Sequence, residues 1–213
     1  MARTKLKKFT KLSKLTNVFN IKSPDIKETL HNYFKAGKNF TLEIGCGHGD
    51  YSVELAQKFP NRNFIGIDIK GARIYRGAMV TEELKLNNVA FVITRAERLN
   101  EIFIPKSIEE IYIPFPEPHV RRTSQNRRLI SPSFLKIYKE LLVDSGILHF
   151  RTDSQELFEY AIKSIADSQG EILHLTEDLH NDENLKIKSI IMTSFEKHYI
   201  NGGRKIKYIC FRF

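Results

Sequence analysis

A glycine triplet close to a carboxylate is the first stretch of this sequence whose residues could do chemistry. Glu43 lies near the end of an apolar run, and Gly45, Gly47 and Gly49 follow it at alternate positions. Glycines at this spacing permit positive φ and let the backbone approach a ligand closely. A strand, this glycine turn (residues 45–49) and a following helix would form a nucleotide-type cradle, although the same turn can join a strand to a helix without any ligand.

The spacing of the glycines and the charge of Glu43 narrow the choice of ligand. Alternate glycines do not match the Gly-x-Gly-x-x-Gly pattern of dinucleotide sites. A carboxylate beside the cradle would repel a pyrophosphate and attract a cation. S-adenosylmethionine meets this requirement, because its sulfonium and its amino group are both positive. We therefore expect Glu43, Gly45 and Gly47 to bind S-adenosylmethionine as a cofactor.

A second acid, Asp68, follows the next apolar run, residues 64–67. It stands roughly 20 residues after the glycine turn, where an acid can accept hydrogen bonds from both ribose hydroxyls of a nucleotide. A carboxylate at this place can also simply face the N-terminus of the following helix. Together with Glu43 and the glycine spacing, Asp68 is better interpreted as a ribose ligand.

The most specific stretch is a proline loop, residues 114–122, which reads Pro-Phe-Pro-Glu-Pro-His-Val-Arg-Arg. Its alternating prolines restrict the backbone, which would hold Glu117 at a set height above the cofactor. Guanidinium groups in and after the loop suit phosphates, although a run of charge is also typical of a solvated face. These groups belong to Arg121, Arg122, Arg127 and Arg128.

Strands and helices alternate along the chain, and their order would bring these residues together. Alternation of this kind predicts an α/β fold with a mostly parallel sheet of about seven strands and helices on both faces. Besides the strand before the glycine turn, we expect strands at residues 64–67, 89–93, 111–113, 147–150, 171–175 and 205–213. Helices are expected from Asp25 to about residue 37, after the glycine turn, over 71–86, over 131–142 with Ser131 as N-cap, and after an N-cap at Ser154.

Composition limits the class of protein. The chain has 213 residues, 41% of them hydrophobic, which is enough for one core, and we expect a single domain over residues 23–213. The net charge of +9 favours a polyanionic partner. Residues 1–22 are basic and contain no acid before Asp25, so they could form a solvated tail or an arm that orders on RNA.

Cysteine use and hydropathy indicate the compartment. Cys46 and Cys210 are far apart and in no metal-ligand spacing, which is typical of a reducing compartment, and His48 and His119 have no accompanying ligand set. We expect no metal. Because no apolar run approaches the length of a membrane span, we also expect a cytoplasmic protein without a membrane partner. The sequence leaves monomer and homodimer open.

At this point the chain resembles the bacterial tRNA (guanine-N7-)-methyltransferases, the TrmB family. Residues 42–49 resemble the first block of the family, Leu-Glu-Ile-Gly-Cys-Gly-x-Gly. Residues 115–128 are similar to its hallmark, Phe-Pro-Asp-Pro-Trp-Pro-Lys-Lys followed by paired arginines. The resemblance extends from about residue 40 to the end and is carried by an ordered series of blocks. They lie at residues 42–49, 63–70, 115–128, 152–160, 178–180 and 193–197.

The resemblance implies a Rossmann-like class I methyltransferase that transfers a methyl group from S-adenosylmethionine to N7 of a guanine in tRNA. In the family the acceptor is the variable-loop guanine at tRNA position 46. The implied catalytic residue is Glu117. The implied cofactor ligands are Glu43, Gly45, Gly47, Asp68, Arg95, Ala96 and Glu117. The implied substrate ligands are Arg121, Asp153, Thr193, Ser194, Phe195 and Glu196, and the implied RNA contacts are Arg121, Arg122, Arg127 and Arg128.

The chain departs from the family pattern at several of these positions. Pro114 replaces an asparagine, Glu117 an aspartate, and His119-Val120 a tryptophan-proline pair, while Arg95 stands where the family has an acid or an amide. Two further classes stay open. One is a methyltransferase that acts on an exocyclic amine, whose usual Pro-Pro-aromatic loop residues 116–119 match poorly. The other is an RNA-binding protein that has lost catalysis, to which Glu117 and Arg95 point.

The chemistry of guanine supports the first class independently. Its N7 carries an in-plane lone pair, so methyl transfer needs alignment more than it needs a general base. The product ring is cationic, and a carboxylate nearby stabilises that charge. Glu117 or Asp153 could accept from the guanine N1–H and amino group. Two purely structural interpretations also remain open: Asp153 could cap a helix, and Thr193-x-x-Glu196 is an ordinary capping box.

Overall fold

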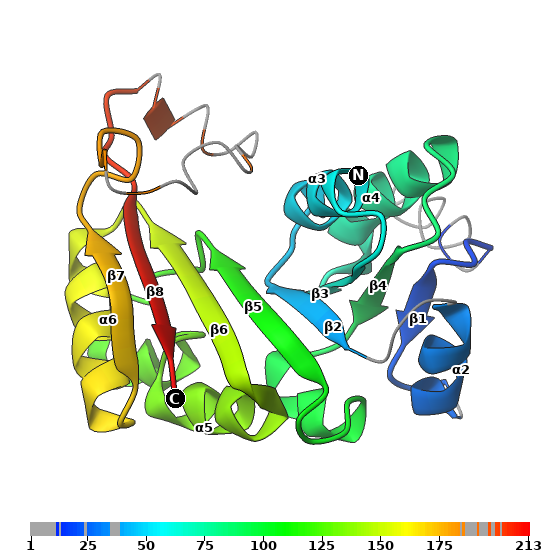
Figure 1. Ribbon diagram of the computed structural model, residues 1–213, viewed down its shortest axis with the longest axis horizontal. Coiled ribbons are helices and arrows are strands. Elements are labelled where there is room, and N and C mark those ends of the chain that lie inside the picture. Colours follow the sequence, from blue (N-terminus) through cyan, green and yellow to red (C-terminus); the bar gives the residue numbers. More distant parts are fainter. Residues whose placement is uncertain are drawn as a thin grey trace.

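A mostly parallel sheet organises the computed structural model, which describes residues 12, 14–23, 25–34, 39–183, 185, 191, 196, 199–200 and 202–213. In this part of the chain the sheet has eight strands, in the order β1-β4-β3-β2-β5-β6-β8-β7 (Figure 1). The strands are β1 (Val18–Asn20), β2 (Phe40–Ile44), β3 (Asn63–Asp68), β4 (Val89–Ile93), β5 (Ile108–Pro114), β6 (Leu142–Thr152), β7 (Glu171–Thr176) and β8 (Lys207–Arg212). Strands β1 to β6 are parallel to one another, and β8 is antiparallel to both β6 and β7.

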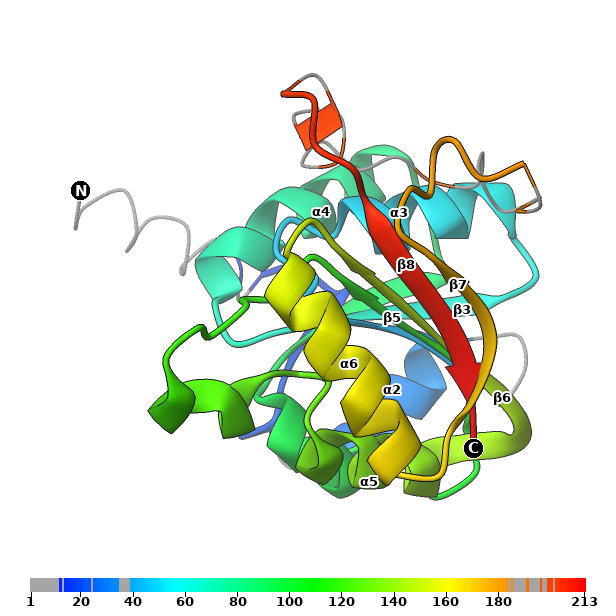
Figure 2. The ribbon, with the colours of Figure 1, turned by 90° about the vertical axis from the view of Figure 1, so that its left-hand side faces the viewer.

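Helices cover both faces of the sheet, as the alternation predicted (Figure 2). The α-helices are α2 (Ile26–Tyr33), α3 (Asp50–Lys58), α4 (Gly71–Glu83), α5 (Pro132–Leu141) and α6 (Gln155–Asp167), and the 3₁₀ helices are η1 (Ala96–Glu101) and η2 (Arg122–Arg127). Helices α3 and α4 pack on one face, where Phe64 and Phe91 lie. Helices α2, α5 and α6 pack on the other, against Ile65 and Ile67. Because β3 is buried on both faces, its sequence is an apolar run without alternation.

The expected elements are confirmed with small changes at their ends. Helix α4 stops at Glu83 instead of residue 86, because Lys85 has a φ of 54° in the left-handed region. Ser154 caps α6, since its Oγ accepts from the Leu157 N–H at 3.2 Å. Pro132 opens α5, but Ser131 makes no side-chain cap bond. Its Oγ lies 3.3 Å from the Asn126 carbonyl oxygen instead.

The sheet has one strand more than expected, because β1 lies in the basic N-terminal segment. Val18–Asn20 pairs with β4, and the Asn17 side chain donates to the Ala78 carbonyl at 3.0 Å. Residues 1–11 and 13 of the expected arm lie outside the described residues.

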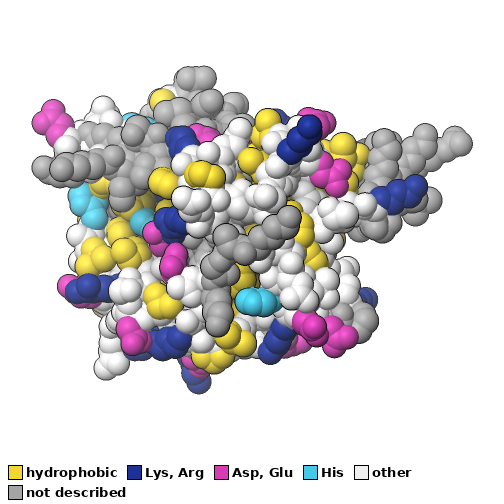
Figure 3. Space-filling view, turned by 45° about the vertical axis from the view of Figure 1, so that its right-hand side comes forward, with side chains coloured by type: hydrophobic (Ala, Val, Ile, Leu, Met, Phe, Trp, Pro, Cys, Tyr) yellow, Lys and Arg dark blue, Asp and Glu magenta, His cyan; other side chains and the backbone are white. Residues whose placement is uncertain are grey.

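The charged side chains on the surface and the hydropathy of the helices agree with the composition of the sequence. Figure 3 shows basic and acidic side chains interspersed on the face that it draws. In the described part of the chain, no helix is both long and apolar enough to cross a bilayer.

Candidate active site

The glycine turn lies at the carboxyl edge of the sheet, between β2 and α3. The N–H groups of Gly45 and Cys46 both donate to the Ile67 carbonyl at 2.9 Å, which fixes the turn against β3. Gly49 has a φ of 75°, and a Cβ there would lie 2.3 Å from the Phe91 ring. Gly47 has a φ of 55°, yet a Cβ on it would meet nothing within 4 Å. The turn therefore packs tightly on the sheet and leaves its outer side open at Gly47.

Glu43 is enclosed beneath this turn, with 4% of the residue exposed. Its Oε2 accepts from the Ser52 N–H at 2.9 Å and from the Ser52 hydroxyl at 2.6 Å. Burial raises the pKa of the carboxyl group to about 8, although the hydrogen bonds from Ser52 favour the charged form. A cationic ligand above Glu43 would stabilise the carboxylate that burial disfavours.

Asp68 ends β3 and ties the glycine turn to α4. Its Oδ2 accepts from the Gly47 N–H at 3.0 Å, and its Oδ1 accepts from the Lys70 N–H at 2.7 Å. Each carboxylate oxygen can accept more than one hydrogen bond, so both can also accept from ligand hydroxyls.

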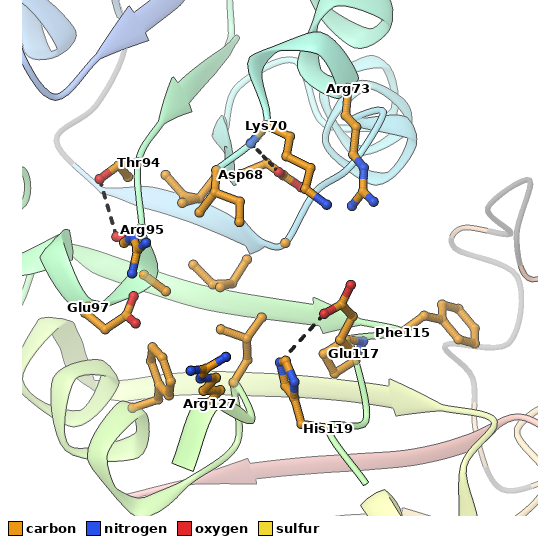
Figure 4. Close-up of a pocket in the computed structure, with 18 residues that line it drawn as sticks. Asp68, Lys70, Arg73, Thr94, Arg95, Glu97, Phe115, Glu117, His119 and Arg127 are labelled. Atoms are coloured by element: carbon orange, nitrogen blue, oxygen red, sulfur yellow. Dashed lines mark hydrogen bonds and ion pairs between the residues drawn. The ribbon is translucent and has the colours of Figure 1, made fainter. Parts of the chain in front are cut away.

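Two adjoining cavities open beside these acids, with volumes of about 500 and 280 Å³. Gly45, Arg73, Phe115 and Glu117 line both of them. Figure 4 shows Asp68 and Glu117 in the larger cavity, on opposite sides. All the residues predicted to bind the cofactor line one or both cavities. In the larger cavity they are Gly45, Asp68, Arg95, Ala96 and Glu117, and in the smaller one Glu43, Gly45, Gly47 and Glu117.

The proline loop carries Glu117 between two positive-φ residues. Phe115 has a φ of 50° and His119 a φ of 41°. Non-glycine residues in this region are strained and persist only where the surroundings hold them. The Glu117 side chain is 73% exposed, and its Oε2 lies 3.8 Å from the His119 Nε2 (Figure 4). A carboxylate thus stands at the junction of the two cavities with its oxygens accessible.

The four arginines predicted to contact RNA do not share one environment. Arg121, Arg122 and Arg127 are exposed, and Arg127 also lines the larger cavity. The prediction for Arg128 needs correction, because only 1% of that residue is exposed. Its guanidinium donates to the Pro118 carbonyl and to the Glu156 carboxylate, so it is not free to bind a phosphate at the surface.

The predicted substrate ligands also divide. Arg121 stands exposed at the end of the proline loop. Asp153 is half-buried, and its Oδ2 accepts from the Arg204 Nη1 at 2.5 Å. The alternative interpretation of Asp153 as a helix cap is wrong, because Ser154 caps α6. Thr193, Ser194 and Phe195 lie outside the described residues.

Glu196 is fully buried in an internal ion pair. Arg151 Nη1 lies 3.0 Å from its Oε2, and His180 Nε2 lies 3.1 Å from its Oε1. In this arrangement the carboxylate pairs with Arg151 of β6 and with His180, which corrects the prediction that Glu196 contacts substrate. The internal ion pair of Arg151 was not predicted. A charged residue directly after the apolar run of residues 147–150 could have indicated a buried charge there.

Arg73 and Tyr199 are further cavity residues that the sequence analysis missed. Arg73 is an exposed side chain in the first turn of α4 and lines both cavities. Tyr199 lines the smaller cavity, where its ring centre lies 5.6 Å from that of Phe115. A basic residue five positions after Asp68 could have been noticed as a candidate for Arg73. Among the described residues, no group of three His, Cys, Asp or Glu side chains could hold a metal ion.

Comparison with known proteins identifies the family. A family model described as a putative methyltransferase matches residues 37–209. A tRNA (guanine-N(7)-)-methyltransferase of Christiangramia forsetii is 36% identical over 220 residues, 99% of this chain and 98% of the relative. One from Cytophaga hutchinsonii is also 36% identical, over 100% of this chain and 99% of the relative. The chain belongs to the tRNA (guanine-N7-)-methyltransferase family.

Solved structures support the fold of this tRNA (guanine-N7-)-methyltransferase family member. An antibiotic-related methyltransferase aligns with a TM-score of 0.64 at 20% identity, over 90% of this chain and 96% of the other. The 16S rRNA methyltransferase KamB aligns with a TM-score of 0.63 at 14% identity, over 88% and 92%. At these identities the likeness shows the class I methyltransferase fold alone. The resemblance found in the sequence is thereby confirmed for both family and fold.

Proposed function

We propose that the protein transfers a methyl group from S-adenosylmethionine to N7 of the variable-loop guanine at tRNA position 46. Membership of the family carries the methyl transfer to a guanine N7 in tRNA. The observation that supports the site most strongly is the position of Glu117. It stands accessible where a cavity with a buried acid, Glu43, adjoins a larger cavity with Asp68.

The residues around the glycine turn fit S-adenosylmethionine. The open side of Gly47 admits close approach of a ligand to the backbone. The buried Glu43 favours a positive group above it, and the two oxygens of Asp68 suit a ribose. When bound, the cofactor supplies a methyl group on a positively charged sulfur.

The cofactor supplies the methyl group, and we assign to Glu117 the contacts that orient and stabilise the guanine. Because guanine N7 needs no deprotonation before it attacks, the site has only to align acceptor and donor. The carboxylate of Glu117 would accept from the guanine N1–H and amino group, and it would stabilise the positive charge that develops on the ring. We assign this role to Glu117 rather than to Asp153, because Arg204 already pairs with Asp153 and neither cavity includes it.

The exposed arginines beside the site would hold the tRNA. Arg121, Arg122 and Arg127 are exposed on the proline loop and η2, and Arg127 lines the larger cavity. Guanidinium groups bind phosphates bidentately and carry no sequence information by doing so. A tRNA substrate and a net charge of +9 agree with a cytoplasmic enzyme that works on nucleic acid.

Nucleoside analysis tests the proposal. The protein is incubated with methyl-labelled S-adenosylmethionine and a tRNA that has a variable-loop guanine, and the product is digested to nucleosides. We expect the label in 7-methylguanosine. A matched tRNA with adenine at that position should stay unlabelled. Label in an amino-methylated guanine or adenine would instead show the exocyclic-amine class. Binding of both cofactor and tRNA without any transfer would show an RNA-binding protein that has lost catalysis.

A further inference from the structure

A buried arginine, Arg128, connects one end of the proline loop to the rest of the fold. Arg128 directly follows η2 and is 1% exposed, although its neighbour Arg127 is exposed. A guanidinium has five donors and is always charged, so its complete burial requires several partners.

Those partners lie on two different elements. Arg128 Nε donates to the Pro118 carbonyl at 2.8 Å, and its Nη2 lies 3.3 Å from the His119 carbonyl. The same Nη2 also donates to the Glu156 carboxylate. The guanidinium carbon lies 4.4 Å from the centre of the Tyr160 ring. Glu156 and Tyr160 both belong to α6, so Arg128 fastens the backbone of the loop to this helix.

The helix is a firm support for the loop. Ser154 caps α6, and Leu157 and Phe158 are buried in the core beneath it. Glu156 is in its first turn, where a carboxylate is also favoured by the helix dipole.

The fastened carbonyls belong to the two residues that follow Glu117. On the other side of Glu117, the Phe115 N–H donates to the Arg151 carbonyl at 2.9 Å, so the loop is held at both ends. His119 keeps a φ of 41°, which needs support from its surroundings. A change at Arg128 would release one end of a strained segment whose centre is the accessible carboxylate.

We propose that Arg128 is a positioning residue for methyl transfer: it holds the Pro118 and His119 carbonyls so that Glu117 stays at the junction of the two cavities. This inference rests on the proposed function of Glu117. It gives Arg128 a task different from that of the exposed arginines beside it.

Single-turnover methylation by the full-length Arg128→Lys variant tests the proposal. Lysine keeps the positive charge but lacks the planar set of guanidinium donors and the stacking on the Tyr160 ring. We expect the rate at saturating tRNA to fall about 10- to 100-fold, since small displacements of a reacting group have effects of this size. Cofactor affinity and the salt dependence of tRNA binding should stay as in wild type. Arg127→Ala is the matched comparison, and it should instead reduce the salt dependence.

Three further measurements keep the proposal falsifiable if a variant folds poorly. Methylguanidine added to Arg128→Ala should restore part of the methylation rate, an effect that it should not have on Glu117→Gln. Glu156→Gln leaves Arg128 in place and removes the charge that pairs with it, so it should slow methylation in the same direction and less. Hydrogen exchange of residues 117–124 should be faster in Arg128→Lys than in wild type, whether or not the protein is active.

The outcomes separate this proposal from the proposed function. A wild-type rate in Arg128→Lys, or unchanged exchange in residues 117–124, would overturn the positioning role. A reduced salt dependence like that of Arg127→Ala would show a phosphate contact and overturn it as well. An inactive wild-type protein would refute the proposed function, and the exchange measurement would still decide whether Arg128 holds the loop.

Discussion

Glu43 shows how a single buried residue can oppose stability and serve binding. Burial raises the pKa of its carboxyl group from 4.5 to about 8, so the free protein holds this group largely protonated at neutral pH. The folded state then binds a proton that the unfolded state releases above pH 4.5. The stability associated with this proton is complete below pH 4.5 and is lost as the pH rises towards about 8.

Glu43→Gln should therefore be more stable than wild type at pH 8.5 by up to about 5 kcal/mol, at about 1.4 kcal/mol for each unit of the displacement from 4.5 to about 8. The difference should shrink as the pH falls towards 5.5. The same variant should bind S-adenosylmethionine more weakly, by about 1–3 kcal/mol, because the cofactor no longer meets a charged partner. Urea unfolding at both pH values and calorimetry measure the two effects. A stability difference that does not change with pH would show that Glu43 is ionised throughout.

Unlike Glu43, Glu117 should matter for turnover and little for stability, since its side chain is 73% exposed and contributes little to the core. Glu117→Gln should reduce turnover about 10- to 100-fold, because it removes charge stabilisation from the reacting base. Affinities for cofactor and tRNA should change little. Glu159→Gln, an exposed acid of α6 outside both cavities, is the control. Steady-state kinetics that show Glu117→Gln as fast as wild type would make the carboxylate structural.

Among the elements, α4 supports the glycine turn from behind. A Cβ on Gly77 would lie 2.3 Å from the His48 carbonyl oxygen and 2.9 Å from the Phe91 ring. Backbone and ring must therefore shift in Gly77→Ala. We expect a loss of about 1–3 kcal/mol in the free energy of unfolding. We also expect weaker cofactor binding, because His48 is next to Gly47.

Glu83→Ala provides the control for Gly77→Ala, since it changes an exposed residue of the same helix. Denaturant unfolding should show an effect within about 0.5 kcal/mol for this variant. If Gly77→Ala binds the cofactor as wild type does, the packing of α4 does not determine the shape of the turn.

The sequence predicted the elements whose signals are local. Strand β4 has the predicted bounds, Val89–Ile93, because a buried parallel strand is a continuous apolar run. Ser154 was predicted as a cap from its place before an apolar helical face. The three residues of β1 are too few for a periodic pattern, so that strand was missed. The acids of the site were found because strand ends in a parallel sheet meet at one edge.

Burial of charge could not be predicted, because distant partners determine it. Arg127 and Arg128 are neighbours of the same type, and only the second meets Pro118 and Glu156, which are 10 and 28 residues away along the chain. Glu196 likewise pairs with Arg151 across 45 residues. An exposed contact was predicted for Arg128 from its residue type and for Glu196 from the family resemblance, while the fold encloses both side chains.

For the whole molecule, the net charge of +9 predicts tRNA binding that weakens with salt. The logarithm of the affinity should fall linearly with the logarithm of the salt concentration. Replacing Arg122 and Arg127 with Ala should flatten this line by about one unit for each phosphate that the variant no longer binds. Lys58→Ala with Lys106→Ala is the matched control, because both lysines are exposed at the opposite edge of the sheet. An equal change in both double variants would indicate general charge attraction without a defined RNA surface.

The central claim is that a guanine N7 accepts the methyl group, and one measurement tests it most directly. Two tRNA transcripts are compared in single-turnover methylation: one with guanine at the variable-loop position, and one with 7-deazaguanine there, which replaces N7 by carbon and keeps the N1–H and amino group. We predict equal binding of the two transcripts, complete methylation of the first and none of the second. Methylation of both transcripts at the same rate, or of neither while cofactor and tRNA are bound, would contradict the account.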